Sequence, residues 1–379
     1  MISFDAVTKK YPNGTTAVDD LSLELAEGRI TVLVGPSGCG KTTTLRMINR
    51  MVEPTTGTVS LRGRDIREVN APELRRGIGY VIQHAGLFPH RTVLDNIATV
   101  PLLRGWGKKK ARARAAELLE LVGLPAEMAK RYPNQLSGGQ QQRVGVARAL
   151  GADPPVLLMD EPFSAVDPIV RAELQAEFIR LQKELHKTIV FVTHDIDEAI
   201  RLGDAIAVFR TGGRLAQFDT PERLLARPAD DFVADFVGHD RGIRRLSFVK
   251  AAELPLRDGP VLPATAPVAE ARAADEPWVL VVDDGRRPLG WAPVAELPDG
   301  GTLADTPLAP IGHTFSLVGD SARAALDSAL LSPARLAVGV DAAGAVVGVV
   351  NAYELSAGAA KQAPALDKVT ADAPGGGDR

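Results

Sequence analysis

Eight consecutive residues close to the N-terminus have the types and spacing that can hold a phosphate group. They fit the pattern G-x-x-x-x-G-K-[ST] and read Gly35-Pro36-Ser37-Gly38-Cys39-Gly40-Lys41-Thr42. The glycines let the backbone turn so that successive N–H groups face an anion, and a helix that begins there adds the positive end of its dipole. Lys41 would then reach the β- and γ-phosphates of a nucleotide. The Thr42 hydroxyl is a hard oxygen ligand of the kind that Mg²⁺ prefers.

The residues around this loop predict the elements that it must connect. Ile30–Val34 is a short apolar run that is typical of a buried strand, and Thr42–Arg50 predicts a helix. Because strand, loop and helix follow one another in the order that phosphate binding requires, we prefer this interpretation to a chance glycine-rich turn.

A pair of carboxylates follows another predicted strand. Val156–Met159 is apolar and leads into Asp160 and Glu161. A carboxylate at this place in a chain with a phosphate loop is the expected partner of Mg²⁺. If the strand geometry continues, Glu161 points to the opposite side and can serve as a general base or orient a water. The alternative is a solvated acidic turn.

Two further predicted strands end in polar residues. Gly79–Ile82 leads into Gln83, whose amide can contact Mg²⁺ or a water, or lie in a solvated loop. Thr188–Val192 leads into His194, which can hydrogen bond a γ-phosphate or an attacking water. Because ligands of open α/β sheets gather at the carboxyl ends of strands, we expect these side chains to share one site.

A second helix start with the features of an anion site lies further along the chain. Ser137 is a good N-cap, and Gly138-Gly139 permits close approach to the backbone before Gln140. On its own, such a start is weak support for phosphate binding.

Tyr11 has two interpretations. It precedes the predicted turn Pro12-Asn13-Gly14 and could form an aromatic shelf for a nucleotide base. From its position alone, ordinary strand packing is the favoured interpretation, because tyrosine is enriched in strands.

Composition describes a soluble chain with large cores. The 379 residues predict about two to three domains. Hydrophobic residues make up 45% and charged residues 24%, the net charge is −3, and Cys39 is the single cysteine. We find no apolar run long enough for a membrane span and no signal peptide, which favours the cytoplasm and leaves any membrane role to a partner.

The segment 89–124 predicts helices. Leu118, Leu119 and Val122 recur at helical spacing and indicate a core face. The basic run Lys108–Lys110 is interpreted as a solvated helix face rather than a nucleic-acid or lipid site, because the whole chain is acidic.

Together, these motifs resemble those of ATP-binding-cassette (ABC) transporter ATPases over residues 1–238. The resemblance implies an α/β P-loop NTPase domain with a mixed sheet core and a helical subdomain at about 89–150. It also implies site roles: Tyr11 stacks on adenine, residues Gly35 to Thr43 hold the phosphates, Gln83 contacts Mg²⁺ and a membrane subunit, Asp160 supports Mg²⁺, Glu161 is the catalytic base, and His194 binds the γ-phosphate.

The same resemblance implies a dimer. Ser137, Gly138, Gly139 and Gln140 would act in trans on ATP held by a second copy, and Asp167 would bridge the two subunits. Other implied partners are integral permease subunits and, indirectly, an extracytoplasmic substrate-binding protein. The protein would be peripheral to the cytoplasmic face of the membrane and would bind no nucleic acid.

A narrower resemblance concerns the cargo. Residues 79–90, 221–238 and 240–246 are similar to ATPases that drive uptake of quaternary-amine osmoprotectants, which implies glycine betaine, carnitine, choline or proline betaine. The alternatives are import of another small solute, such as an amino acid or sulfonate, and a soluble ABC protein of translation or DNA repair.

Composition changes after Gly238, where alanine, proline and glycine rise. After a linker at 239–245, residues 246–356 contain an internal repeat offset by 58 residues. The repeat resembles a tandem pair of cystathionine-β-synthase-type (CBS-type) regulatory modules, although the aspartate expected for ribose binding is not evident. Dimerisation or ionic-strength sensing, an adenine-type ligand and a degenerate relic are the interpretations left open. Residues 357–379 are predicted to be a disordered tail.

Overall fold

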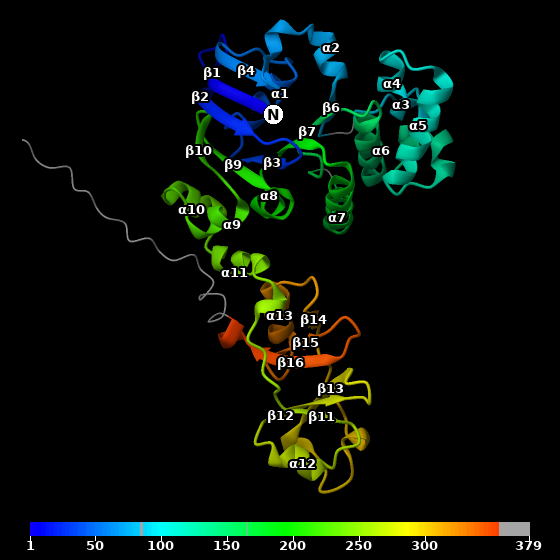
Figure 1. Ribbon diagram of the computed structural model, residues 1–379, viewed down its shortest axis with the longest axis vertical. Helices are drawn as coiled ribbons and strands as arrows, with labels where there is room; N and C mark the ends of the chain where they lie inside the picture. The colour runs from blue at the N-terminus through cyan, green and yellow to red at the C-terminus, as the bar shows by residue number, and fades with distance from the viewer. Residues whose placement is uncertain (84–85, 165, 356–379) are drawn as a thin grey trace, which may run out of the picture. The chain divides into compact units, whose positions relative to one another are not determined.

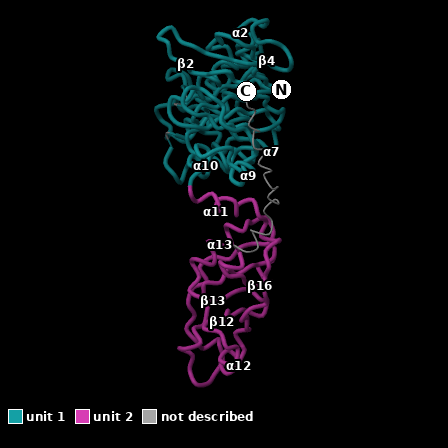
Figure 2. Tube along the Cα trace, turned by 90° about the vertical axis from the view of Figure 1, so that its left-hand side faces the viewer, with its two compact units in different colours: residues 1–238 teal, residues 239–379 magenta. Residues whose placement is uncertain are grey.

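Two compact units make up the described part of the chain. The computed structural model describes residues 1–83, 86–164 and 166–355. The first unit is Met1–Gly238 and the second begins at His239 (Figure 2). The predicted tail at 357–379 lies outside the described residues, as does Ala165. No helix in the described ranges is long and apolar enough to cross a membrane.

A six-stranded sheet forms the centre of the first unit (Figure 1). Its strand order is β10-β9-β3-β8-β7-β6, and all neighbours are parallel except β9 and β10. The strands are β3 (Ile30–Val34), β6 (Ile78–Val81), β7 (Val156–Asp160), β8 (Thr188–Val192), β9 (Ala205–Arg210) and β10 (Arg214–Asp219). Every residue of β3, β7 and β8 is buried, which explains why these strands read as continuous apolar runs.

Alternate residues of these strands enter two different cores. In β8, Ile189 and Phe191 pack into the core beneath the helices, whereas Val190 and Val192 face a second sheet. That sheet is antiparallel, with the order β2-β1-β4-β5. Its strands are β1 (Ile2–Lys10), β2 (Thr16–Leu25), β4 (Thr56–Leu61) and β5 (Arg64–Asp65). The mixed sheet core expected from the sequence is confirmed.

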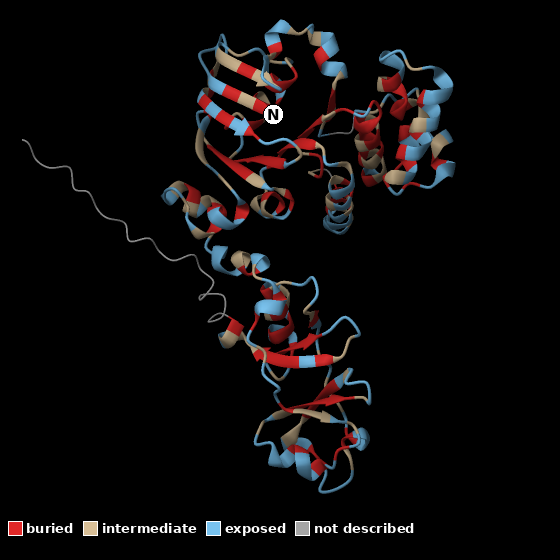
Figure 3. Ribbon diagram, in the orientation of Figure 1, coloured by how far each residue is buried: buried red, intermediate tan, exposed pale blue. Residues whose placement is uncertain are grey.

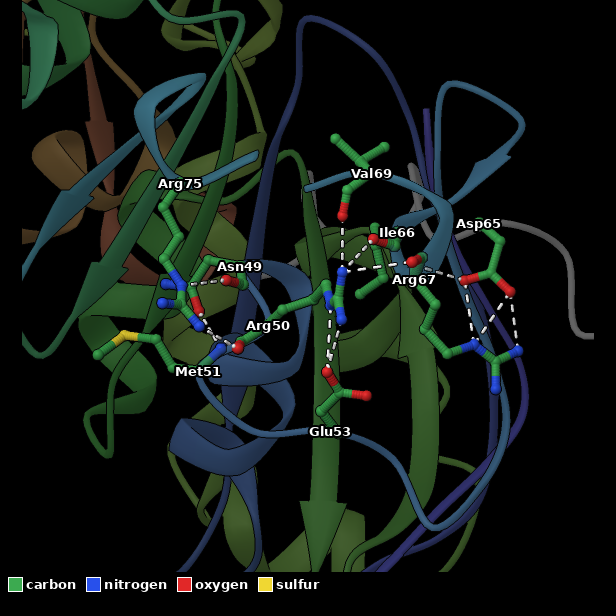
Figure 4. A network of polar contacts seen from close by, with 9 residues as sticks. All are labelled: Asn49, Arg50, Met51, Glu53, Asp65, Ile66, Arg67, Val69 and Arg75. Carbon is green, nitrogen blue, oxygen red and sulfur yellow. Dashed lines mark hydrogen bonds and ion pairs between the residues drawn. The ribbon is translucent and has the colours of Figure 1, made fainter. Parts of the chain in front are cut away.

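Helix α1 (Lys41–Ile48) lies between the two sheets, and hydrogen bonds from a side chain outside the helix hold its C-terminal end. It is shorter than the predicted Thr42–Arg50, because Arg50 adopts a positive φ of 53° just after the C-cap. Arg75 donates hydrogen bonds to the carbonyls of Asn49 and Arg50, which satisfies acceptors that a helix end leaves free (Figure 4). The Arg50 guanidinium in turn bonds Glu53 and the carbonyls of Ile66 and Val69.

Helices cover the other face of the six-stranded sheet, and their exposed sides alternate with buried ones in Figure 3. They are α3 (Val93–Ile97), α4 (Thr99–Leu103), α5 (Lys108–Leu121), α6 (Gly138–Leu150), α7 (Pro168–Leu185), α8 (Ile196–Leu202), α9 (Pro221–Ala226) and α10 (Asp231–Val237). Helix α2 (Ala71–Arg76) instead contributes Leu74 to the core that faces the second sheet. Helices α3, α5 and α6 contact one another and form the helical part expected at 89–150. Leu118 and Leu119 are buried as predicted, and Lys108–Lys110 are exposed.

The second unit contains the predicted repeat. The segment expected to be a linker contains α11 (Arg241–Arg245), and the helices α12 (Val268–Ala273) and α13 (Ala322–Leu331) follow. One three-stranded sheet comprises β11 (Val261–Pro263), β12 (Trp278–Val282) and β13 (Pro288–Pro293), and the other β14 (Thr314–Ser316), β15 (Leu336–Val340) and β16 (Val346–Asn351). Both have the same pairing, and β15 begins 58 residues after β12. Trp291 and its counterpart Val349 are fully buried in one core that joins the two sheets.

Candidate functional site

The loop that joins β3 to α1 can be built only with glycine at two positions. Gly35 has a φ of 152° and Gly40 a φ of 96°. A Cβ on Gly35 would lie 2.3 Å from the carbonyl oxygen of Phe209, and one on Gly40 would lie 1.9 Å from that of Ala17. The loop is therefore pressed against the end of β9 and against β2, with its free side at the start of α1. Gly40 caps α1 without a side-chain acceptor, so the first N–H groups of the helix are free to meet an anion.

Lys41 is folded onto this loop. Its side chain is buried, and Nζ donates hydrogen bonds to the carbonyls of Gly35 at 2.7 Å and Pro36 at 3.0 Å. Cys39 Sγ lies 3.7 Å from the same nitrogen. Burial raises the pKa of the Cys39 thiol above its usual value, although the Lys41 ammonium acts in the opposite direction. The ammonium group therefore lies against the same loop that is predicted to bind the phosphates.

Thr42 and Asp160 come together as predicted. The Thr42 hydroxyl donates to Asp160 Oδ1 at 2.9 Å, which joins the first turn of α1 to the end of β7. Two residues that the sequence interpretation did not include complete this cluster: the Tyr80 hydroxyl donates to Oδ2 at 3.4 Å, and Arg46 Nη2 lies 3.7 Å from it. Arg46 could have been found, because it follows Thr42 by four residues and such pairs share one helix face.

Glu161 departs from the geometry that the sequence suggested. It does not continue β7, so strand alternation does not determine its direction. Its φ is 45°, in the left-handed region, and its N–H donates to the carbonyl of Val192 on β8 at 3.0 Å. Strained backbone of this kind persists where the surrounding structure holds it, and it is common at functional sites.

Gln83, Glu161 and His194 form one cluster at the carboxyl ends of β6, β7 and β8. Oε2 of Glu161 lies 3.3 Å from Nδ1 of His194 and accepts a 3.3 Å hydrogen bond from Nε2 of Gln83. The same amide nitrogen donates to Oγ of Ser164 at 3.2 Å, and the Ser164 hydroxyl donates to the carbonyl of Glu161 at 2.9 Å. Ser164 is therefore a member of the cluster that the sequence interpretation did not assign to the site.

The four residues Ser137–Gln140 lie elsewhere, at the start of α6. The Ser137 hydroxyl accepts from the N–H of Gln140 at 3.3 Å, and the Gln140 side chain accepts from the N–H of Ser137 at 3.0 Å. This reciprocal cap confirms Ser137 as the N-cap. Within the described residues, no hydrogen bond joins this segment to residues 35–43 of the same chain.

Asp167 and Tyr11 each have a local role in the structure. Asp167 caps α7, and its carboxylate accepts from the N–H groups of Ile169 and Val170 at 3.2 and 3.1 Å. Tyr11 follows β1 and is 36% exposed, with the Lys9 ammonium 5.2 Å from its ring centre. About a third of the residue is thus accessible to solvent.

Comparison with known proteins identifies the family. The family model described as "ABC transporter" matches residues 18–164. The osmoprotectant import ATP-binding protein OsmV of Salmonella typhimurium is 46% identical over 330 residues, which cover 84% of this chain and 85% of that protein. This chain belongs to the ABC transporter ATP-binding proteins. The match to OsmV covers 330 residues, which is more than the first unit Met1–Gly238 contains, so the similarity extends into the second unit.

Other ABC proteins support the assignment. The glycine betaine/carnitine/choline transport ATP-binding protein OpuCA of Bacillus subtilis is 50% identical over 261 residues, covering 69% of this chain and 68% of that protein. Among solved structures, the dimeric bacterial ABC transporter cassette MJ0796 is 36% identical, with a TM-score of 0.54 over 58% of this chain and 99% of that chain. The first unit is thus an ATP-binding ABC cassette, and the chain is an ABC-type ATPase.

The donor set of this ABC cassette fits the magnesium ion of an Mg²⁺–ATP complex. The Thr42 hydroxyl and the Asp160 carboxylate are hard oxygen ligands, already 2.9 Å apart, beside free N–H groups at the start of α1. Gln83 was predicted to join them. In the structure its amide nitrogen donates to Glu161 and Ser164, which leaves the contact of its amide oxygen with Mg²⁺ a prediction.

Proposed function

We propose that this chain is the ATP-hydrolysing subunit that powers import of quaternary-amine osmoprotectants through a membrane permease. The cargo class rests on one observation: similar proteins that match most of the chain, OsmV and OpuCA among them, are named for osmoprotectant, glycine betaine, carnitine or choline transport. We expect the cargo to be glycine betaine, carnitine, choline or proline betaine.

The proposed chemistry begins with phosphate binding. Residues Gly35 to Thr43 would surround the phosphates with backbone N–H groups, and Lys41 would exchange its two carbonyl acceptors for phosphate oxygens. Thr42 and Asp160 would hold Mg²⁺, which neutralises phosphate charge when bound. Tyr11, with an exposed ring, would stack on the adenine.

Glu161 is the proposed general base. Its carboxylate would take a proton from the attacking water as the bond between the γ-phosphorus and the bridging oxygen breaks. Gln83 and His194 both contact Oε2 of Glu161, so they can hold the carboxylate in one direction, and His194 is exposed enough to reach a γ-phosphate. We propose that Gln83 also contacts Mg²⁺ and the membrane subunit once nucleotide is bound.

A second copy of the chain would complete each ATP site. Ser137–Gln140 have no hydrogen bond to residues 35–43 of their own chain in the described part, and MJ0796, which is 36% identical, is a dimer. We therefore propose that these residues act on ATP held by the partner copy, with Asp167 at the contact between subunits. The dimer would bind permease subunits at the cytoplasmic face of the membrane.

The second unit is proposed to regulate transport as a CBS-type pair. Its two β-α-β-β copies share strand order and pairing, and they pack through one common core around Trp291. We favour dimerisation or sensing of ionic strength over an adenine-type ligand or a relic.

The experiment that tests the cargo is ATP turnover of the assembled transporter with its binding protein and a panel of solutes. We expect stimulation by glycine betaine, carnitine or choline. Stimulation by an amino acid or a sulfonate instead would overturn the cargo assignment and leave the ATPase assignment intact.

A further inference from the structure

A small polar cavity borders the Glu161–His194 pair. Its volume is about 40 Å³, and its wall includes Glu161, Arg171, Thr193, His194 and Glu198. One water needs roughly 10–15 Å³ of such space together with two to four polar partners. The cavity is therefore large enough and polar enough to hold ordered water beside the proposed base.

Glu198, in the first turn of α8, is a buried carboxyl in this wall. Its side chain is 7% exposed, and Gln175 Nε2 on α7 donates a 2.9 Å hydrogen bond to its Oε1. Arg201 Nη1 donates to the Gln175 side-chain oxygen at 3.1 Å. Burial raises the pKa of the Glu198 carboxyl above its usual value, although hydrogen bonds from Thr193 and Gln175 act in the opposite direction. A buried polar contact thus joins α7 to α8.

Arg171 contributes the opposite charge to the same cavity. It lies in the first turns of α7, close to Asp167, and its Nη2 donates to the carbonyl of Val166 at 3.2 Å. Its Nε is buried and has no hydrogen-bond partner among the described residues. Buried donors are normally paired, so water in the cavity is the natural acceptor for this group.

We propose that Glu198 is a positioning residue for ATP hydrolysis: with Arg171 it holds ordered water in this cavity, and the resulting cluster fixes the orientation of Glu161 and His194. This inference rests on the proposed role of Glu161 as the base. The side chains of Glu161 and His194 lie on loops rather than on strands, and the helices after these loops, α7 and α8, are the two that Gln175 and Glu198 connect. A catalytic group that is misplaced by about 1 Å can lose about 10²-fold in rate.

The test compares variants of the full-length chain by their kcat and KM for ATP. Glu198→Gln keeps the size of the side chain and its bond to Gln175 but replaces the carboxyl group that lines the cavity with Arg171. We expect kcat to fall by about tenfold to a hundredfold with KM unchanged, because a misplaced group affects the chemical step and not binding. Glu173→Gln, on the exposed side of α7, is the matched control and should leave both constants unchanged.

A double variant that exchanges the two side chains distinguishes two roles for Glu198: orienting the site residues, or only holding α7 against α8. Gln175→Glu combined with Glu198→Gln keeps a side-chain hydrogen bond between α7 and α8, with donor and acceptor exchanged, and places the new carboxylate beside Arg201. We expect the swap to fold with a melting temperature close to that of the unmodified chain and yet to keep the low kcat. Recovery of full kcat in the swap, or full kcat in Glu198→Gln, would overturn the proposal.

Glu161→Gln, assayed beside these variants, tells the two proposals apart. Loss of turnover in Glu161→Gln together with full turnover in Glu198→Gln would reject only the positioning role. Full turnover in Glu161→Gln would reject the base assignment, whatever Glu198→Gln shows.

Discussion

The imidazole Nδ1 of His194 lies 3.3 Å from the carboxylate Oε2 of Glu161, although 32 residues of chain and one long helix separate the two. Strands β7 and β8 are adjacent and parallel, with Asp160 opposite Val192. Glu161 leaves β7 in a left-handed conformation, and its N–H bonds the carbonyl of Val192. The backbone turn that ends one strand therefore brings the carboxylate to the loop that ends the next.

This contact makes Glu161→Gln the most direct test of the proposed chemistry. The amide keeps the shape of the side chain but cannot accept a proton, so phosphate release should slow by about 10²-fold or more. ATP binding should persist, and a stable ATP-bound dimer should accumulate. The measurements are phosphate release and size-exclusion chromatography with ATP. Full turnover in this variant would show that another group is the base.

Lys41→Ala should weaken ATP binding. Loss of a charged donor weakens the binding free energy by about 1.5–3 kcal/mol, so the dissociation constant should become roughly tenfold to hundredfold larger. Binding of a labelled ATP analogue measures the change, and Lys183→Ala, an exposed substitution on α7, is the control. Equal affinity in Lys41→Ala and the control would mean that the ammonium stays on the carbonyls of Gly35 and Pro36 when nucleotide binds.

The sequence predicts the central strands well because their burial on both faces leaves an uninterrupted apolar signal. β3 and β8 have the predicted bounds, and β7 extends the predicted strand by one residue. β10 was not predicted, since it pairs on one side only and its residues Arg214–Asp219 mix polar and apolar types. Edge strands carry a weaker pattern because one side of them meets solvent.

The polar contacts of the site were less predictable. Sequence spacing shows that Gln83, Asp160, Glu161 and His194 follow strands, and strand order then places them at one edge. It does not show that Glu161 turns left-handed, since that conformation depends on a hydrogen bond to β8. Contacts between distant segments, such as Tyr80 with Asp160, require the register of β6 against β7.

Gly40→Ala should destabilise the first unit even without nucleotide. A Cβ there would meet the Ala17 carbonyl oxygen at 1.9 Å and would also require a left-handed conformation. We expect a loss of more than about 2 kcal/mol, since backbone must move. Gly14→Ala is the control, because its φ of 84° is similar but nothing lies within 4 Å, so about 1–2 kcal/mol is expected. Thermal melting measures both, and equal melting temperatures would contradict the contact.

Cys39 should react slowly with alkylating reagents at neutral pH. The thiol is fully buried and burial raises its pKa, so the reactive thiolate forms only at a higher pH than for an exposed cysteine. The alkylation rate of the folded protein should therefore keep rising at pH values where the rate for the urea-unfolded chain is already constant. Once modified, the protein should lose ATP binding, because Sγ lies 3.7 Å from Lys41 Nζ. Fast labelling at pH 7 would show that the loop opens.

Removal of the second unit tests its proposed regulatory role. The two units have separate cores, so a chain that ends at Gly238 should keep the packing around its ATP site. Basal ATP turnover should then remain, whereas the dependence of turnover on salt in the assembled transporter should change.

Trp291→Ala in the full chain gives an independent test of the same role. It removes a fully buried side chain from the core between the two repeats and should lower the stability of the second unit by about 3–5 kcal/mol. Calorimetry should show a lower melting transition for the second unit alone, and transport should show the same altered salt dependence as the truncation. An unchanged salt dependence in both variants would reject ionic-strength sensing by this unit.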